Sequence, residues 1–167
     1  MNDTSAKPAF TAAGRNRARK LAMQGLYQWE MTRNAPVTIE AQFHSDNEME
    51  NVDSEYLHRL LFGAVEMLTN TIDDSNELDQ LYGSFLTSVK MAELDPVTKA
   101  ILRLASFELK ERVDVPYRVI IAEAITLGKK FCAKDTHKFV NGVLDRVAAE
   151  LRQAEFNADR QSTRPLF

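Results

Sequence analysis

The stretch from Asp95 to Leu151 reads DPVTKAILRLASFELKERVDVPYRVIIAEAITLGKKFCAKDTHKFVNGVLDRVAAEL. It contains three helix-start signals, at Asp95-Pro96, Asp114-Val115-Pro116 and Asp135, because Asp caps free N–H groups and Pro fits the first helical turn. After each signal, apolar residues return at steps of three or four, the spacing of one helix face. The stretch therefore predicts three consecutive helices, and this prediction decides the fold class.

The beginning of the chain shows the same period. Apolar residues at three- and four-residue steps predict a helix from Gly14 to about Arg33. Residues 34–36 end it, because the chain before a proline disfavours helical geometry. A weaker helix is predicted over Thr38–Phe43, and the acidic, polar stretch His44–Val52 is predicted to be a loop.

A clear amphipathic helix follows. Asp53 is a good N-cap for it, and its apolar stripe runs through Ile72 and extends toward Tyr82. The polar residues 73–76 indicate a break in that extension. The segment Gly83–Leu94 is ambiguous between a loop and a short helix.

Almost every periodic segment has a period near 3.6 residues, and none alternates convincingly. This predicts an all-α fold, a compact helical bundle. We expect one helical domain over residues 14–153. The Ala-, Thr- and Ser-rich residues 1–13 are expected to form a disordered N-terminal tail, and the polar residues 154–167 a flexible C-terminal tail.

Composition excludes several classes of protein. The 167 residues are 44% hydrophobic and 27% charged, enough for one domain with a real core. A single cysteine, Cys132, excludes a disulfide framework and a cysteine-only zinc site, and His44, His58 and His137 lack metal-ligand spacing. The sequence shows neither an apolar run of membrane-spanning length nor an apolar signal core, so we expect a cytoplasmic protein without bound metal or cofactor.

The formal net charge of −3 hides an uneven distribution. Residues 1–35 carry +4, residues 36–95 carry −11, and residues 96–167 carry +4. Basic ends suit a polyanion and an acidic middle suits a basic protein. A surface whose opposite charges balance one another across the fold is the alternative.

The first candidate site is the start of the first helix, where Arg15, Arg17, Arg19 and Lys20 fall within six positions. A helix N-terminus already favours anions, and four added cations suit a nucleic-acid backbone better than a single phosphate. A solvated basic tail is the alternative. In the same helix, Trp29 continues the apolar stripe, while Tyr27 points elsewhere and is a candidate surface anchor.

The second candidate site opens the last predicted helix, over residues 131–142. Interleaved cations and aromatic rings suit single-stranded nucleic acid, because bases stack and phosphates need counter-charges. Both Phe131 and Phe139 can instead belong to the core. Gly142 lies inside a helix, where close packing of a neighbouring backbone would explain a glycine.

The sequence gives little support for a catalytic function. Cys132 and His137 lack a catalytic context, and there is neither a glycine-rich phosphate loop nor a G-x-S-x-G motif. Glu108 and Glu111 lie among Lys110 and Arg112, which indicates a solvated helix face. We therefore expect a protein that is not an enzyme.

Three motifs resemble the NusB family of bacterial transcription antitermination factors. They are RARKLAMQGLYQW at residues 17–29, RVDVPYRV at residues 112–119, and DTHKFVNGVLD at residues 135–145. Their order and spacing match the family over about residues 15–150. Asn16 interrupts what is often an unbroken arginine run, and Ala122 stands where Asn is common.

The resemblance implies two packed three-helix sub-bundles and no catalysis. It implies binding of boxA RNA together with NusE, which is the small-subunit ribosomal protein S-ten, in a complex with other Nus factors and RNA polymerase that supports transcription of ribosomal RNA operons. It assigns RNA contact to Arg15, Arg17, Arg19, Lys20, Asp135, Thr136, His137, Lys138 and Phe139, and the NusE contact to Tyr27.

Three alternatives stay open at this point. A NusB-like domain also forms part of certain ribosomal RNA cytosine methyltransferases, but this sequence has no glycine-rich cofactor loop, so we do not expect a catalytic domain. A NusB-like protein-interaction module with only non-specific RNA affinity is the second. A homodimer that hides the RNA face is the third.

Overall fold

A computed structural model describes residues 11–162 of the chain. The predicted tail residues 1–10 and 163–167 lie outside this range. The described elements are α1 (Ala12–Thr32), α2 (Pro36–Asp46), α3 (Ser54–Thr69), β1 (Thr71–Ile72), β2 (Ser75–Asn76), α4 (Glu77–Gly83), the 3₁₀ turn η1 (Met91–Glu93), α5 (Pro96–Glu111), α6 (Tyr117–Phe131), α7 (Thr136–Leu151) and α8 (Gln153–Ser162).

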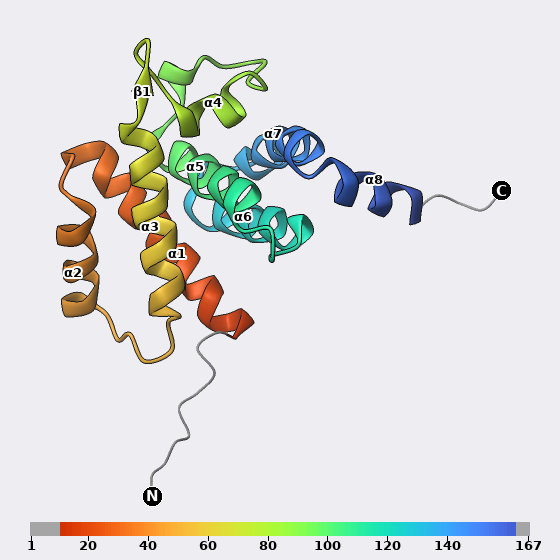
Figure 1. Cartoon of the computed structure of the whole chain (residues 1–167). Coiled ribbons are helices and arrows are strands. Elements are labelled where there is room, and N and C mark those ends of the chain that lie inside the picture. Colours follow the sequence, from red (N-terminus) through yellow and green to blue (C-terminus); the bar gives the residue numbers. More distant parts are fainter. Residues whose placement is uncertain (1–10, 163–167) are drawn as a thin grey trace, which may run out of the picture.

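Six of the eight described α-helices form two groups of three, which confirms the predicted all-α fold of packed sub-bundles. The helices α1, α2 and α3 contact one another, and so do α5, α6 and α7. Both α1 and α3 pack on α5, which therefore joins the two groups (Figure 1). Residues 100–109 of α5 are all buried, so this helix is surrounded by protein over most of its length.

Capping side chains explain where several helices begin. The Asp53 carboxylate accepts a hydrogen bond from the Tyr56 backbone N–H at 3.0 Å and caps α3. The Asp95 carboxylate accepts from the N–H groups of Val97 and Thr98, with Pro96 in the first turn of α5. These two predicted starts are confirmed. The Thr11 hydroxyl caps α1, so the helix already includes two residues of the predicted tail.

The region after α3 differs from the prediction. Helix α3 ends at Thr69 rather than running on toward Tyr82, and a small antiparallel hairpin pairs Thr71 with Asn76. Its turn places Asp73 and Asp74 at φ values of 52° and 64°, a left-handed geometry that Asp tolerates better than most residues. Helix α2 extends to Asp46, three residues beyond the predicted end at Phe43.

The chain is also helical where the sequence predicts a C-terminal tail from Ala154 on. Helix α8 is held by polar contacts that begin just before it. The Arg152 guanidinium donates hydrogen bonds to the carbonyl oxygens of residues 108, 109, 112 and 115, at the end of α5 and the loop after it. The Glu155 carboxylate accepts from the backbone N–H of Tyr117 at 2.9 Å, and so caps α6 from α8.

Candidate nucleic-acid and partner interface

The cations at the start of α1 do not share one environment. Arg17 is exposed, and its guanidinium donates to the Asn51 carbonyl oxygen at 3.1 Å. Arg15 is partly covered and lies 3.8 Å from the Asp53 carboxylate and 3.7 Å from that of Asp114. Arg17 therefore presents its charge to solvent more openly than Arg15 does.

Arg19 lies inside the protein, with only 3% of its surface exposed. Its Nε donates to both carboxylate oxygens of Glu108, at 2.9 and 3.0 Å, and its Nη1 donates to the Asn16 side-chain oxygen at 2.8 Å. Burial opposes the charged form of Arg19, but the hydrogen bond and charge of Glu108 outweigh it and raise the pKa. This buried position favours a structural role for Arg19 over the predicted RNA contact.

The Arg19–Glu108 pair belongs to a buried cluster around Tyr56. The Tyr56 hydroxyl donates to Glu108 at 2.5 Å, and the guanidinium carbons of Arg15, Arg19 and Arg112 lie 4.3, 5.4 and 4.9 Å from the centre of the ring. Burial, together with the neighbouring Glu108 carboxylate, raises the pKa of Tyr56. The cluster fixes the start of α1 against α3 and α5.

Glu108 is 1% exposed, so the predicted solvated face is wrong for this residue. A signal was available. Glu108 lies three and four positions after Ala105 and Leu104, and so continues the apolar stripe of α5. A carboxylate on a buried stripe requires a cationic partner, which Arg19 supplies.

Lys20 joins the first candidate site to the second. Its ammonium lies 6.0 Å from the centre of the Phe131 ring at the end of α6, and that of Lys130 lies 5.4 Å from the same ring. Lys134 and Lys138 are exposed in the segment that follows. The structure thus places cations from α1 and α6 beside one half-buried aromatic residue.

The start of α7 is exposed but is built differently from the prediction. Asp135 has φ of 70°, and its side chain makes no capping hydrogen bond. Its carboxylate instead lies 3.4 Å from the ammonium of Lys138. The predicted side-chain cap is therefore wrong, because the left-handed backbone turns the Asp135 carboxylate away from the free N–H groups. Asp135 remains an exposed negative charge beside the cations.

The remaining predicted RNA residues are half-buried. Thr136 lies in the first turn of α7, and Phe139 packs partly against the core. His137 lies against Gly128 of α6, where an added Cβ would come within 3.2 Å of the His137 Cβ. The explanation of Gly142 by close packing is wrong, because a Cβ added there would meet nothing within 4 Å.

Tyr27 is 39% exposed, and Trp29 is buried as predicted. Tyr27 borders a small, mostly apolar depression of about 150 Å³, which we call the Tyr27 groove. Its lining comes from α1, the start of α5 and the end of α6: Met23, Gln24, Tyr27, Val97 and Phe131. Phe131 therefore borders both this groove and the cationic cluster.

The family model described as the NusB family matches residues 16–149. The chain belongs to the NusB family. The transcription antitermination protein NusB of Teredinibacter turnerae is 55% identical over 150 residues, which cover 90% of this chain and 97% of that protein. The NusB of Saccharophagus degradans is 51% identical over 90% of this chain and 95% of its own length.

Solved NusB structures have the same fold. The structure of T. maritima NusB has a TM-score of 0.70 and 28% sequence identity, and the match covers 90% of this chain and 98% of that one. A structure of the antitermination factors NusB and NusE in complex with double-stranded RNA has a TM-score of 0.65 and 24% identity, over 81% and 96% of the two chains.

Residues 11–162 of this NusB-family protein contain neither a membrane-spanning helix nor a candidate metal site. None of the helices in this range combines the length and the apolar character needed to cross a membrane. In the same range, the His, Cys, Asp and Glu side chains form no group of three or more that could hold a metal ion.

Proposed function

We propose that this NusB-family protein is an RNA-binding antitermination factor that acts with NusE and has no catalytic activity. The observation that carries the proposal is the position of Phe131. The ammonium groups of the partly buried Lys20 and the exposed Lys130 lie over its ring, and the same residue lines the apolar Tyr27 groove. RNA and a protein partner would therefore bind side by side on one continuous surface.

The RNA surface consists of Arg17, Lys20, Lys134 and Lys138, with Phe139 and His137 between them. Arg15, Asp135 and Thr136 border it. Phosphates would lie on the cations, and the half-buried Phe139 would contact a base. The RNA class we propose is boxA, in ribosomal RNA operons.

The NusE surface is the Tyr27 groove. An aromatic side chain that is partly exposed beside an apolar depression is a typical anchor for a protein partner. We further propose that the complex joins other Nus factors and RNA polymerase, that it works in the cytoplasm, and that a homodimer covering this surface would be inactive in RNA binding.

The test is fluorescence anisotropy with a labelled boxA-like RNA and a scrambled control RNA, at two salt concentrations, with and without NusE. We expect a preference for boxA that increases when NusE is present. Phosphate contact predicts that log affinity falls with log salt, with a slope of about −0.7 per contact for single strands. Equal, salt-sensitive binding to both RNAs would instead support the protein-interaction module.

Two variants separate the surfaces. Lys138→Ala should weaken binding to every RNA and reduce the salt slope by about 0.7. Tyr27→Ala should leave the affinity for RNA alone unchanged and remove the gain that NusE provides. Val37→Ala, an exposed apolar residue on α2, is the matched control for Tyr27. A Tyr27→Ala protein that responds fully to NusE would contradict the assignment.

A further inference from the structure

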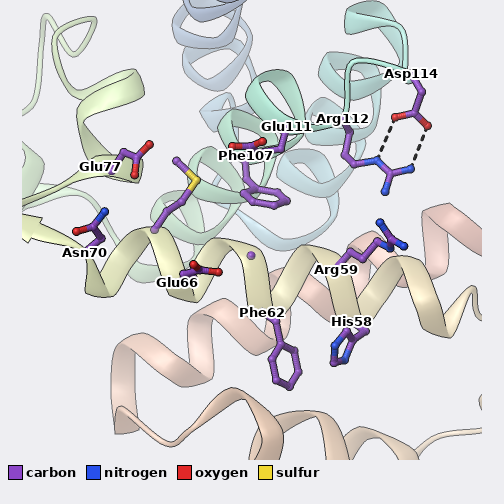
Figure 2. Close-up of a pocket in the computed structure, with 12 residues that line it drawn as sticks. His58, Arg59, Phe62, Glu66, Asn70, Glu77, Phe107, Glu111, Arg112 and Asp114 are labelled. Carbon is purple, nitrogen blue, oxygen red and sulfur yellow. Dashed lines mark hydrogen bonds and ion pairs between the residues drawn. The ribbon is translucent and has the colours of Figure 1, made fainter.

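A larger groove lies between α3 and the end of α5 (Figure 2). It has a volume of about 800 Å³, and we call it the α3–α5 groove. The Phe107 ring is part of its lining (Figure 2), together with Gly63 and Met67. A Cβ on Gly63 would lie 2.3 Å from the Phe107 Cζ, so the glycine is what allows the ring to lie directly on the backbone of α3.

The cations around this groove already have anionic partners. The Arg59 guanidinium pairs with Glu55 at 3.1 Å, and that of Arg112 pairs with Asp114 at 3.0 Å. The His58 imidazole likewise contacts Glu40 at 2.9 Å. To bind an anionic ligand, each of these three side chains would first have to break its contact with a carboxylate.

Three carboxylates that line the groove are not compensated. Within residues 11–162, the side chains of Glu66, Glu77 and Glu111 form neither an ion pair nor a hydrogen bond. They come from α3, the start of α4 and the end of α5, and Figure 2 shows Glu111 next to Phe107, with Glu66 and Glu77 farther along the groove. The groove therefore carries a net negative charge that nothing in this part of the protein neutralises.

We propose that the α3–α5 groove is a second docking site, and that it takes a basic protein segment. Lys or Arg side chains of the segment would pair with Glu66, Glu77 and Glu111, and an apolar side chain between them would rest on Phe107. Charge complementarity selects this occupant, because three unpaired carboxylates repel a nucleic-acid backbone.

This site is separate from the proposed RNA and NusE surface. The Tyr27 groove uses Val97 at the start of α5, whereas the α3–α5 groove uses Phe107 and Glu111 at its end. From Val97 to Glu111 the helix advances by 14 positions, which correspond to about 21 Å along its axis. Both grooves can therefore be occupied at the same time.

The experiment uses the full chain and a short fluorescein-labelled peptide in which lysine and leucine alternate. A peptide with glutamate in place of lysine is the control ligand. We expect the lysine peptide to bind, and to bind about fivefold more weakly to the double variant Glu66→Gln/Glu111→Gln, as expected for the loss of two exposed ion pairs. Both residues are exposed, so the fold should be retained.

The double variant Glu123→Gln/Glu150→Gln is the matched control, because it removes the same charge outside the groove and should keep wild-type affinity. Amide chemical shifts should change at residues 58–70 and 107–112 when the lysine peptide is added. Three results would each overturn the proposal. The first is an equal loss of affinity in both double variants, and the second is equal binding of the glutamate peptide. The third is a set of chemical-shift changes centred on Tyr27.

Discussion

The Nε–H of Arg19 in α1 is shared between the two carboxylate oxygens of Glu108 in α5, at 2.9 and 3.0 Å, across 89 positions of sequence. Asn16 accepts a further hydrogen bond from the same guanidinium at 2.8 Å. The residue that interrupts the arginine run thus helps to hold Arg19 inside the protein. The basic cluster at the start of α1 is therefore divided between a buried, structural arginine and cations that are partly or fully exposed.

This division predicts opposite effects for two neighbouring arginines. Arg19→Ala leaves Glu108 buried without its partner and should lower the free energy of unfolding by about 3–5 kcal/mol. Arg17→Ala changes an exposed residue, so it should alter the free energy of unfolding by less than about 0.5 kcal/mol. It should nevertheless weaken RNA binding. Urea unfolding followed by circular dichroism measures the first effect, and RNA anisotropy measures the second. A stable Arg19→Ala protein with weak RNA affinity would reverse our assignment.

Asp135→Asn should tighten RNA binding about two- to fivefold at low salt. The substitution removes a negative charge from the RNA surface and frees Lys138 from its partner. Asn tolerates the φ of 70° as well as Asp does, so the start of α7 should be unchanged. Glu150→Gln, on the same helix but away from its start, is the control. Unchanged or weaker affinity in a folded Asp135→Asn protein would exclude Asp135 from the RNA surface.

Glu155 caps α6 from the neighbouring helix, so Glu155→Ala should cost about 1 kcal/mol of unfolding free energy. Arg152→Ala should cost more, because four carbonyl oxygens lose a charged donor. Thermal unfolding of both variants, compared with the exposed control Gln153→Ala, measures the difference. Equal melting temperatures for all three variants would show that these contacts contribute nothing.

Acid should weaken the link between α4, α5 and α1. Burial favours the neutral forms of Asp79 and Glu30, but the hydrogen bonds and charge of Arg103 outweigh it, so the pKa of each carboxyl lies below its ordinary value of 3.8 or 4.5. The unfolded chain therefore takes up these protons first as the pH falls. The stabilisation is complete above the ordinary values and is lost as the pH falls below them.

The measurement is the free energy of unfolding in urea from about pH 7 downward. Asp79→Asn should be less stable at neutral pH by about 3–5 kcal/mol, because Arg103 is buried beside it, and should lose less stability on acidification. Glu48→Gln, an exposed change, should follow the wild type. Parallel pH curves for Asp79→Asn and the wild type would show that Asp79 does not contribute to acid sensitivity.

Local signals predicted the fold well where a helix is set by its own residues. Asp53 and Asp95-Pro96 mark the true starts of α3 and α5, because capping involves groups only two or three positions apart. Asp135 resembled them in sequence, but its cap depends on a backbone angle that residue type alone does not determine. The hairpin over residues 71–76 was missed because strands of two residues are too short to show alternation.

Which candidate residues lie together in space depends on partners that are far apart in the sequence. Lys20 and the Phe131–Phe139 segment were found separately, but their adjacency arises only from the packing of the helices. The buried pair of Arg19 and Glu108 joins residues far apart in the chain. Glu155 lies outside both the matched family region and the predicted domain, although it completes the start of α6.

Burial on all sides makes α5 a rigid spacer. The Tyr27 groove and the α3–α5 groove lie near its two ends, so their occupants would be held at a fixed separation of about 21 Å. A single partner with one binding element for each groove would need a linker of at least about six extended residues to reach both. Its second contact would then form at high effective concentration, whereas a shorter linker would restrict it to one groove.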